Sequence, residues 1–271
     1  MLEKIKYINH MNEVLELDNP KMFVQENGLH DFSWNVSSRN DRISGLKRKI
    51  NSKTFTIIIK GESESECREL SNRLFDVMEK DALAAKYGKL YVGEFYLKCY
   101  VVESKKTDYQ RRQGYLKVSL KITTDYPYWV RENTLSFGYG IASEGTSLDF
   151  NRDFPYDFTS NLLGKTVNNN GIVPQNFRMM IYGACEKPSI SIGGHSYTVN
   201  VSVEKNEYVV IDSISKTIIL KHADGTETNC FNLRDKDSYI FEKIPVGSSL
   251  VDGNYKFDLT LLEERSEPKW I

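Results

Sequence analysis

Residues 63–86, SESECRELSNRLFDVMEKDALAAK, decide the fold of the first half of the chain. Ser63, with Glu66 three residues later, forms a possible capping box. The apolar residues that follow recur at helical spacing, namely Cys67, Leu70, Leu74, Val77 and Met78. Gly88 is a stop signal for a helix. The pattern therefore predicts one amphipathic helix over residues 63–86, whose apolar stripe packs on a neighbouring sheet.

Strand patterns flank this helix on both sides. The opening stretch alternates around Ile5 and Tyr7 and predicts a short hairpin, and residues 54–60 carry a β-branched run. Residues 89–103 and 114–124 also predict strands, with the polar residues 104–113 between them as an exposed hairpin loop. We therefore expect a first domain over residues 1–135, made of β structure with a single helix.

The second half contains no long helical period. Short strand patterns recur at roughly ten-residue spacing, which is typical of a sandwich or jelly roll. The clearest strand spans residues 197–203, and turns are expected at Asp224-Gly225 and Asp252-Gly253. Glycine and proline punctuate the stretch before it. We expect a linker over residues 136–155 and an all-β second domain over residues 156–271.

Composition limits the class of protein. The 36 lysine and arginine residues nearly balance the 37 aspartate and glutamate residues, so the chain lacks the charge of a dedicated nucleic-acid or membrane-surface binder. The amino terminus lacks the apolar stretch of a signal peptide, and no window is apolar enough for a spanning helix. The four cysteines are widely spaced, which indicates reduced thiols in a protein made in a cytosol.

The sequence contains no recognisable catalytic, metal-binding or cofactor-binding motif. The phosphate-binding loop, the nucleophile elbow and the zinc-protease pattern are all missing, and the four histidines lie in polar or turn contexts. A glycosidase pair is recognised by separation in space rather than by sequence, so that alternative stays open. Basic clusters such as residues 47–49 could meet nucleic acid, although solvated loops or protein contacts are favoured.

Three aromatic and proline-containing landmarks follow one another along the chain. They are residues 125–129 (DYPYW), residues 153–158 (DFPYDF) and residues 265–270 (RSEPKW). In their order and spacing, and in the lengths of the two expected domains, they resemble the distal tail protein family of long, flexible-tailed phages. The resemblance covers the whole chain and matches the short form of the family, without an inserted carbohydrate-binding module.

The resemblance implies a fold and a non-enzymatic role. The first domain would form a ring of six subunits, and the second would be a galectin-like β-sandwich outside it. Such a hub would join the tail tube protein to fibre or receptor-binding proteins at the virion tail tip, with DNA passing through the ring without sequence-specific contact. The alternative is a lectin-like adhesion module, because a galectin-like domain could bind carbohydrate.

Six residues are candidate structural or interface positions. The basic side chains of the polar segment 104–113 could reach a neighbouring subunit, and the two tryptophans are expected to anchor packing. The six are Lys105, Lys106, Arg111, Arg112, Trp129 and Trp270.

Overall fold

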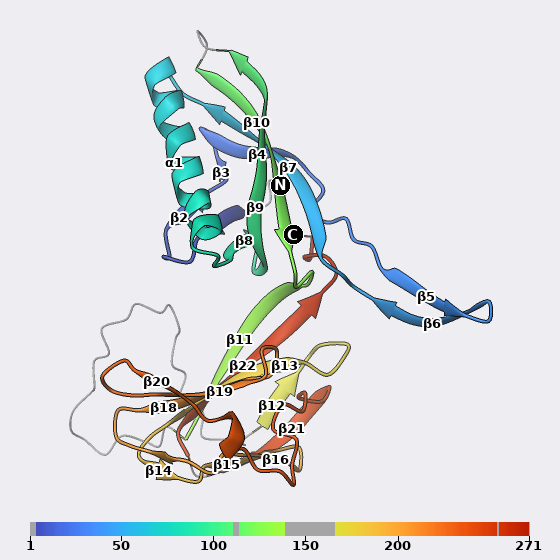
Figure 1. Cartoon of the computed structure of the whole chain (residues 1–271), viewed down its shortest axis with the longest axis vertical. Helices are drawn as coiled ribbons and strands as arrows, with labels where there is room; N and C mark the ends of the chain where they lie inside the picture. The colour runs from blue at the N-terminus through green and yellow to red at the C-terminus, as the bar shows by residue number, and fades with distance from the viewer. Residues whose placement is uncertain (1–3, 111–113, 139–165, 254, 271) are drawn as a thin grey trace. The chain divides into compact units, whose positions relative to one another are not determined.

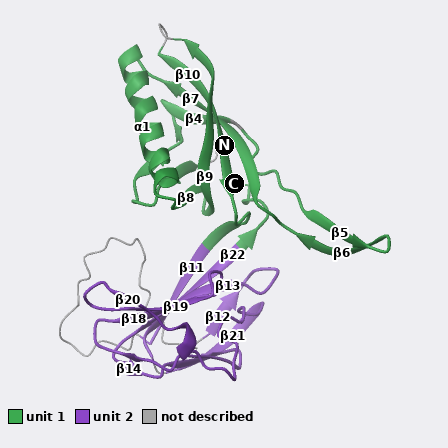
Figure 2. Cartoon of the chain, viewed as in Figure 1, with its two compact units in different colours: residues 1–131, 264–271 green, residues 132–263 purple. Residues whose placement is uncertain are grey.

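The computed structural model describes residues 4–110, 114–138, 166–253 and 255–270. The chain divides into two compact units, shown in different colours in Figure 2: unit 1 comprises residues 1–131 and 264–271, and unit 2 comprises residues 132–263. The expected domains differ from these units in two respects: residues 132–135, expected in the first domain, belong to unit 2, and the last eight residues, expected in the second domain, belong to unit 1. Most of the expected linker lies outside the described residues.

Unit 1 is a curled antiparallel sheet with one helix, α1 (Glu64–Leu83), along its face (Figure 1). β9 is long: its first part pairs with β8 and its second part with β10. The sheet strands are β1 (Ile5–Ile8), β2 (Val14–Glu16), β3 (Asp18–Asn19), β4 (Met22–Asn27), β7 (Asn51–Lys60), β8 (Gly88–Val92), β9 (Phe95–Gln110) and β10 (Tyr115–Thr124). A separate hairpin consists of β5 (Asn35–Arg39) and β6 (Arg42–Lys47).

The predicted helix is confirmed, and its stripe contributes to the core of unit 1. It ends at Leu83, before the predicted end at residue 86, because the chain turns at Ala85 with a φ of 51°, and Gly88 begins β8. The Ser63 side chain caps the helix by accepting the backbone N–H of Glu66 at 3.2 Å. The Glu66 carboxylate accepts the backbone N–H of Glu62 instead of that of Ser63, so the reciprocal half of the capping box is displaced by one residue. Leu74 and Met78 pack in one cluster with the inward side chains of β7 and β10.

Two sequence expectations for unit 1 are wrong. Residues 104–110 were expected to form a loop because they are polar, but they continue β9 as a strand. Backbone pairing with the ten residues of β10 holds this polar stretch in the sheet. Residues 89–103 form two strands, since Gly93 at a φ of 59° turns the chain between β8 and β9.

Unit 2 is a β-sandwich, as expected. One layer has the order β20-β19-β18-β13-β22-β11 and the other the order β12-β21-β15-β16, and side chains from both layers form a single buried cluster. The strands are β11 (Trp129–Phe137), β12 (Thr166–Asn169), β13 (Asn176–Tyr182), β14 (Cys185–Glu186), β15 (Ser189–Ile192), β16 (His195–Thr198), β17 (Ser202–Val203), β18 (Tyr208–Asp212), β19 (Thr217–Lys221), β20 (Glu227–Asn229), β21 (Gly247–Asp252) and β22 (Phe257–Arg265), with a short 3₁₀ helix η2 (Phe231–Leu233).

The expected turn at Asp224-Gly225 joins β19 to β20, which pair with each other. The turn at Asp252-Gly253 does not make a hairpin, because β21 pairs with β12 and β15 whereas β22 pairs with β13. The expected single strand over residues 197–203 is wrong, because the chain leaves β16 after Thr198 and re-enters a strand at Ser202, where β17 pairs with β14 instead of β15. Alternation of apolar residues does not tell which strand or layer a segment joins. The four cysteines are free thiols.

Candidate assembly surface

A protruding hairpin dominates the surface of unit 1. We call residues 28–50, which include β5 and β6, the arm. The two strands pair only with each other, and Figure 1 shows them extending away from the body of unit 1. Asn40 and Asp41 connect them with φ angles of 51° and 57°, as in the tight two-residue turns that suit a hairpin's twist. A two-stranded hairpin of this kind is marginally stable by itself in water.

The arm carries an apolar face with no cover within the described residues. Val36 lies directly opposite Leu46, and a β-bulge in β6 then brings Ile43 opposite Ser38, on the same face as that pair. Six large apolar side chains of the arm are between 40% and 72% exposed: Phe32, Trp34, Val36, Ile43, Leu46 and Ile50. Monomeric proteins rarely expose so many neighbouring apolar groups, which typically mark interaction sites.

A buried lysine fixes the point where the arm begins. The Lys53 ammonium donates hydrogen bonds to the carbonyl oxygens of Gly28 at 3.3 Å, Leu29 at 2.9 Å and Asp31. Burial, with the nearby Arg48 charge, lowers the pKa of Lys53 to about 8. The three carbonyls belong to the turn that leads into β5, so the orientation of the arm's root depends on this side chain.

Arg48 holds the other end of the arm against the body of unit 1. Its guanidinium lies 5.0 Å from the ring centre of Tyr128 and 5.5 Å from that of Trp34. All three guanidinium nitrogens are buried and have no hydrogen-bond partner in the described part of the chain. Burial lowers the pKa of Arg48. The arm is also cationic, with five basic and two acidic residues among residues 28–50.

The four basic candidates of the polar segment are only partly described. Lys105 is 71% exposed and forms an ion pair with Glu103 at 2.6 Å. Lys106 reaches across to α1, where its ammonium lies 4.2 Å from the ring centre of Phe75. Arg111 and Arg112 lie outside the described residues. Lys105 and Lys106 lie on β9 and not on a loop.

The two tryptophans differ in their surroundings. Trp129 is fully buried in the core of unit 1, in agreement with the expected anchoring role. Trp270 is 72% exposed and is not a buried anchor. Its ring stacks on His30 at a centroid distance of 3.8 Å, so it lies on the root of the arm. The sequence around Trp129 and Trp270 contains no signal that tells a buried tryptophan from an exposed one.

The arm itself was not predicted from the sequence. Its strands contain serine, asparagine and arginine between single apolar residues, which weakens the alternation typical of a half-buried strand. The Asn40-Asp41 pair was the available turn signal. The sequence of residues 47–49 indicates a basic cluster and does not reveal that Arg48 contacts Tyr128.

Neither a metal-binding cluster nor a membrane-spanning helix is found in the described ranges. No group of three or more His, Cys, Asp or Glu side chains is placed to hold a metal ion in these ranges. None of the helices described combines the length and apolar character that a bilayer crossing requires.

Comparison with solved structures assigns the fold. A chain of the phage P2 baseplate in its activated conformation with calcium aligns with a TM-score of 0.62 at 15% identity, covering 99% of this chain and 100% of that one. The corresponding strontium structure gives 0.60 at 16% identity, with coverage of 99% and 100%. The SPP1 Dit protein, a hub adsorption protein of phages that infect Gram-positive bacteria, gives 0.59 at 10% identity, with coverage of 98% and 100%.

The chain has the fold of these baseplate and hub proteins. The expected likeness to distal tail proteins is thus confirmed for the fold, over both units. No protein-family model matches the sequence, and no curated protein matches it by sequence. At 10% to 16% identity the likeness lies in the arrangement of strands and in the single helix, and it gives no residue-level assignment.

Proposed function

We propose that this chain is a structural hub protein of a phage tail tip. The observation that carries the proposal is the two-way coverage: nearly the entire chain aligns with the entire length of baseplate and hub chains. A protein that shared only a β-sandwich with them would align over one unit. The role is geometric, because a hub works by sustained multivalent contact and not by turnover of a substrate.

The hub assembles as a ring of six copies, and the arm is its principal contact. The uncovered face of Val36, Ile43 and Leu46 needs an apolar partner. In a ring of identical copies, each arm meets the same surface on the body of the next copy. The contact is heterologous, since the arm of one copy lies on the body of the next. Permanent contacts of this kind commonly bury about 2,000 Å² or more.

Charge shapes the rest of the ring. The positive charge of the arm disfavours docking of two arms on each other, which favours contact of the arm with the body of the next copy. Lys105, Lys106, Arg111 and Arg112 are proposed contacts of a neighbouring subunit or of the ring lumen. The Glu103 partner of Lys105 offsets part of that positive charge, which suits a channel through which DNA passes without being held.

The ring joins the tail tube protein on one side to fibre or receptor-binding proteins on the other, at the virion tail tip. Immunogold labelling of intact particles, with antibody raised against the purified chain, tests this location. We expect label at the end of the tail opposite the head. Label on the head, along the tail, or only on lysate material would refute the proposed role.

A further inference from the structure

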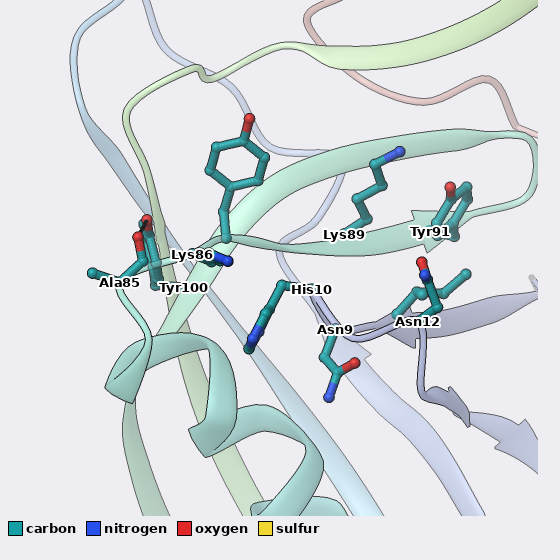
Figure 3. Close-up of a pocket in the computed structure, with 10 residues that line it drawn as sticks. Asn9, His10, Asn12, Ala85, Lys86, Lys89, Tyr91 and Tyr100 are labelled. Carbon is teal, nitrogen blue, oxygen red and sulfur yellow. Dashed lines mark hydrogen bonds between the residues drawn. The ribbon is translucent and has the colours of Figure 1, made fainter. Parts of the chain in front are cut away.

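A cavity of about 500 Å³ opens on unit 1, and Figure 3 shows the residues that line it. Its walls come from the β1–β2 turn, from the segment after α1, and from β8 and β9. The volume falls within the usual range for small-ligand sites. The residues that define its chemistry are His10, Lys86, Tyr87, Lys89, Tyr91 and Tyr100.

His10 is oriented by a buried carboxylate beneath the cavity. Asp81, on the last turn of α1, is fully buried, and its Oδ1 lies 2.5 Å from Nδ1 of His10 and accepts the His10 backbone N–H at 2.8 Å. The other oxygen of Asp81 accepts the Tyr7 hydroxyl at 2.5 Å. A proton on Nδ1 therefore faces Asp81, and the imidazole cannot rotate without losing this bond.

This arrangement leaves Nε2 of His10 for a ligand. Within the described ranges Nε2 has no hydrogen-bond partner, although the His10 side chain is only 17% exposed. The network is built tightly: a methyl group on Gly88 would lie 2.2 Å from the Tyr7 hydroxyl and 2.3 Å from Asp81. A ring held in one orientation by a buried network is typical of a site that presents a nitrogen to a bound group.

The cavity favours an anion. Its described lining includes His10, Lys86 and Lys89 but no aspartate or glutamate. The Lys89 ammonium lies 4.4 Å from the ring centre of Tyr96, which places a charge at the wall. The two lysines attract a carboxylate or phosphate, whereas Asp81 beneath the cavity offsets any charge on His10, which therefore contributes a hydrogen-bonding nitrogen.

Three tyrosines make the remaining wall and indicate that the anion is attached to a ring. The Tyr100 hydroxyl donates to the carbonyl of Ala85 at 3.1 Å, which fixes its position. The rings of Tyr87 and Tyr100 lie at 76° to each other, with centroids 6.5 Å apart. Because the Tyr87 and Tyr100 rings are nearly perpendicular, they cannot stack on both faces of a flat nucleobase. They suit a puckered ring with apolar C–H groups on more than one side and hydroxyls that need donors and acceptors.

We infer that this cavity binds an anionic saccharide, a pyranose ring carrying a carboxylate or phosphate. The anionic group contacts Lys86, a hydroxyl group of the sugar donates to Nε2 of His10, and the sugar ring lies against the tyrosines. The inference is independent of the arm and of ring assembly, because every residue involved belongs to one copy of unit 1.

Titration of the full-length chain with glucuronate and glucose 6-phosphate, followed by ligand-observed NMR and calorimetry, tests the inference. Glucose and inorganic phosphate are matched controls, since each lacks one half of the ligand. We expect both anionic sugars to saturate one site and both controls to bind at least about tenfold more weakly. Lys86→Ala and His10→Gln should each weaken binding by about tenfold, and Lys105→Ala, on a distant part of β9, should leave it unchanged.

Four results would overturn the inference. Equal binding of glucose would remove the role of the cationic groups, and equal binding of phosphate would remove the role of the tyrosines. Tighter binding of adenosine monophosphate than of either sugar would assign the cavity to nucleotides. Lack of saturation at about 20 mM sugar would show that no such site exists. Because His10→Gln could disturb Asp81, Tyr87→Ala is a second variant, and it must weaken the sugars but not phosphate.

Discussion

Two hairpins of unit 1 differ in whether their apolar face is buried. In the β9–β10 hairpin, the inward side chains of β10 are buried beneath α1 in the core of the unit. In the arm, the facing side chains Val36 and Leu46 are more than half exposed. Both hairpins place apolar residues on one face, but only one has a helix of its own chain to cover it. The difference indicates that the arm's cover comes from another molecule, which in our proposal is the next copy in a ring.

The largest expected difference is between two tryptophans. Trp129→Ala should lower the free energy of unfolding by about 3–5 kcal/mol, because it removes a fully buried ring from the core of unit 1. Trp34→Ala, in the arm, should cost about 1 kcal/mol, mainly through the lost contact with Arg48. Denaturant melts of both variants measure this. Equal costs would mean that the arm is part of the folded core.

A pair of leucines makes the same comparison at a smaller scale. Leu120→Ala on β10 should cost about 2–5 kcal/mol, since Leu120 is fully buried under the helix. Leu46→Ala on β6 should stay within about 0.5 kcal/mol of the parent for the dissociated chain. Thermal melts at low protein concentration are the appropriate measurement. A large cost for Leu46→Ala would indicate a cover for the arm within the same chain.

The arm's root should be sensitive to pH. The pKa of Lys53 falls from an ordinary 10.5 to about 8 on folding, so between these values the unfolded chain holds more protons than the folded one. Its contribution to the free energy of unfolding therefore rises with pH through this window. Lys53→Met should remove that rise and cost about 1–3 kcal/mol by leaving carbonyls unpaired. Identical pH profiles of the two proteins would contradict the proposed anchoring.

A partly buried carboxylate in the body of unit 1 should show the opposite slope. Burial raises the pKa of Glu264 from 4.5 to about 7, and its carboxylate contacts the Tyr126 hydroxyl. The folded chain then holds the extra proton, so the contribution of Glu264 is complete below pH 4.5 and is lost as pH rises through about 7. Glu264→Gln should flatten this part of the stability profile by a small amount. An unchanged slope would show that Glu264 is not the titrating group.

The sequence predicted the regular parts of the fold because their signals are local. The helix followed from the spacing of Leu70, Leu74 and Met78. Alternation over residues 197–203 did not reveal that the structure divides this stretch into β16 and β17. Pairing between strands that lie far apart in the chain leaves no local signal in the sequence. The placement of β21 and β22 in different layers, and the return of residues 264–271 to unit 1, depend on contacts that single-strand patterns do not encode.

The candidate surface was harder to predict than the fold. Resemblance to distal tail proteins led to the correct fold, but the interface residues chosen were basic side chains and tryptophans. The apolar face of the arm arises only when the bulge in β6 aligns Ile43 with Val36 and Leu46. The cavity beside His10 likewise depends on Asp81, which lies 71 residues away in the chain. Neither feature can be derived from spacing.

The most direct test of the account is the mass of the purified full-length chain, measured by light scattering after size exclusion over a range of concentrations. We expect the parent to form assemblies up to six copies of the 31.3 kDa chain. The triple variant Val36→Ser, Ile43→Ser, Leu46→Ser should remain a folded single copy, whereas the control pair Ile172→Ser, Leu250→Ser, two exposed apolar residues of unit 2, should assemble like the parent. A parent that never exceeds one copy, or a triple variant that assembles equally well, would contradict the claim that the arm joins neighbouring copies.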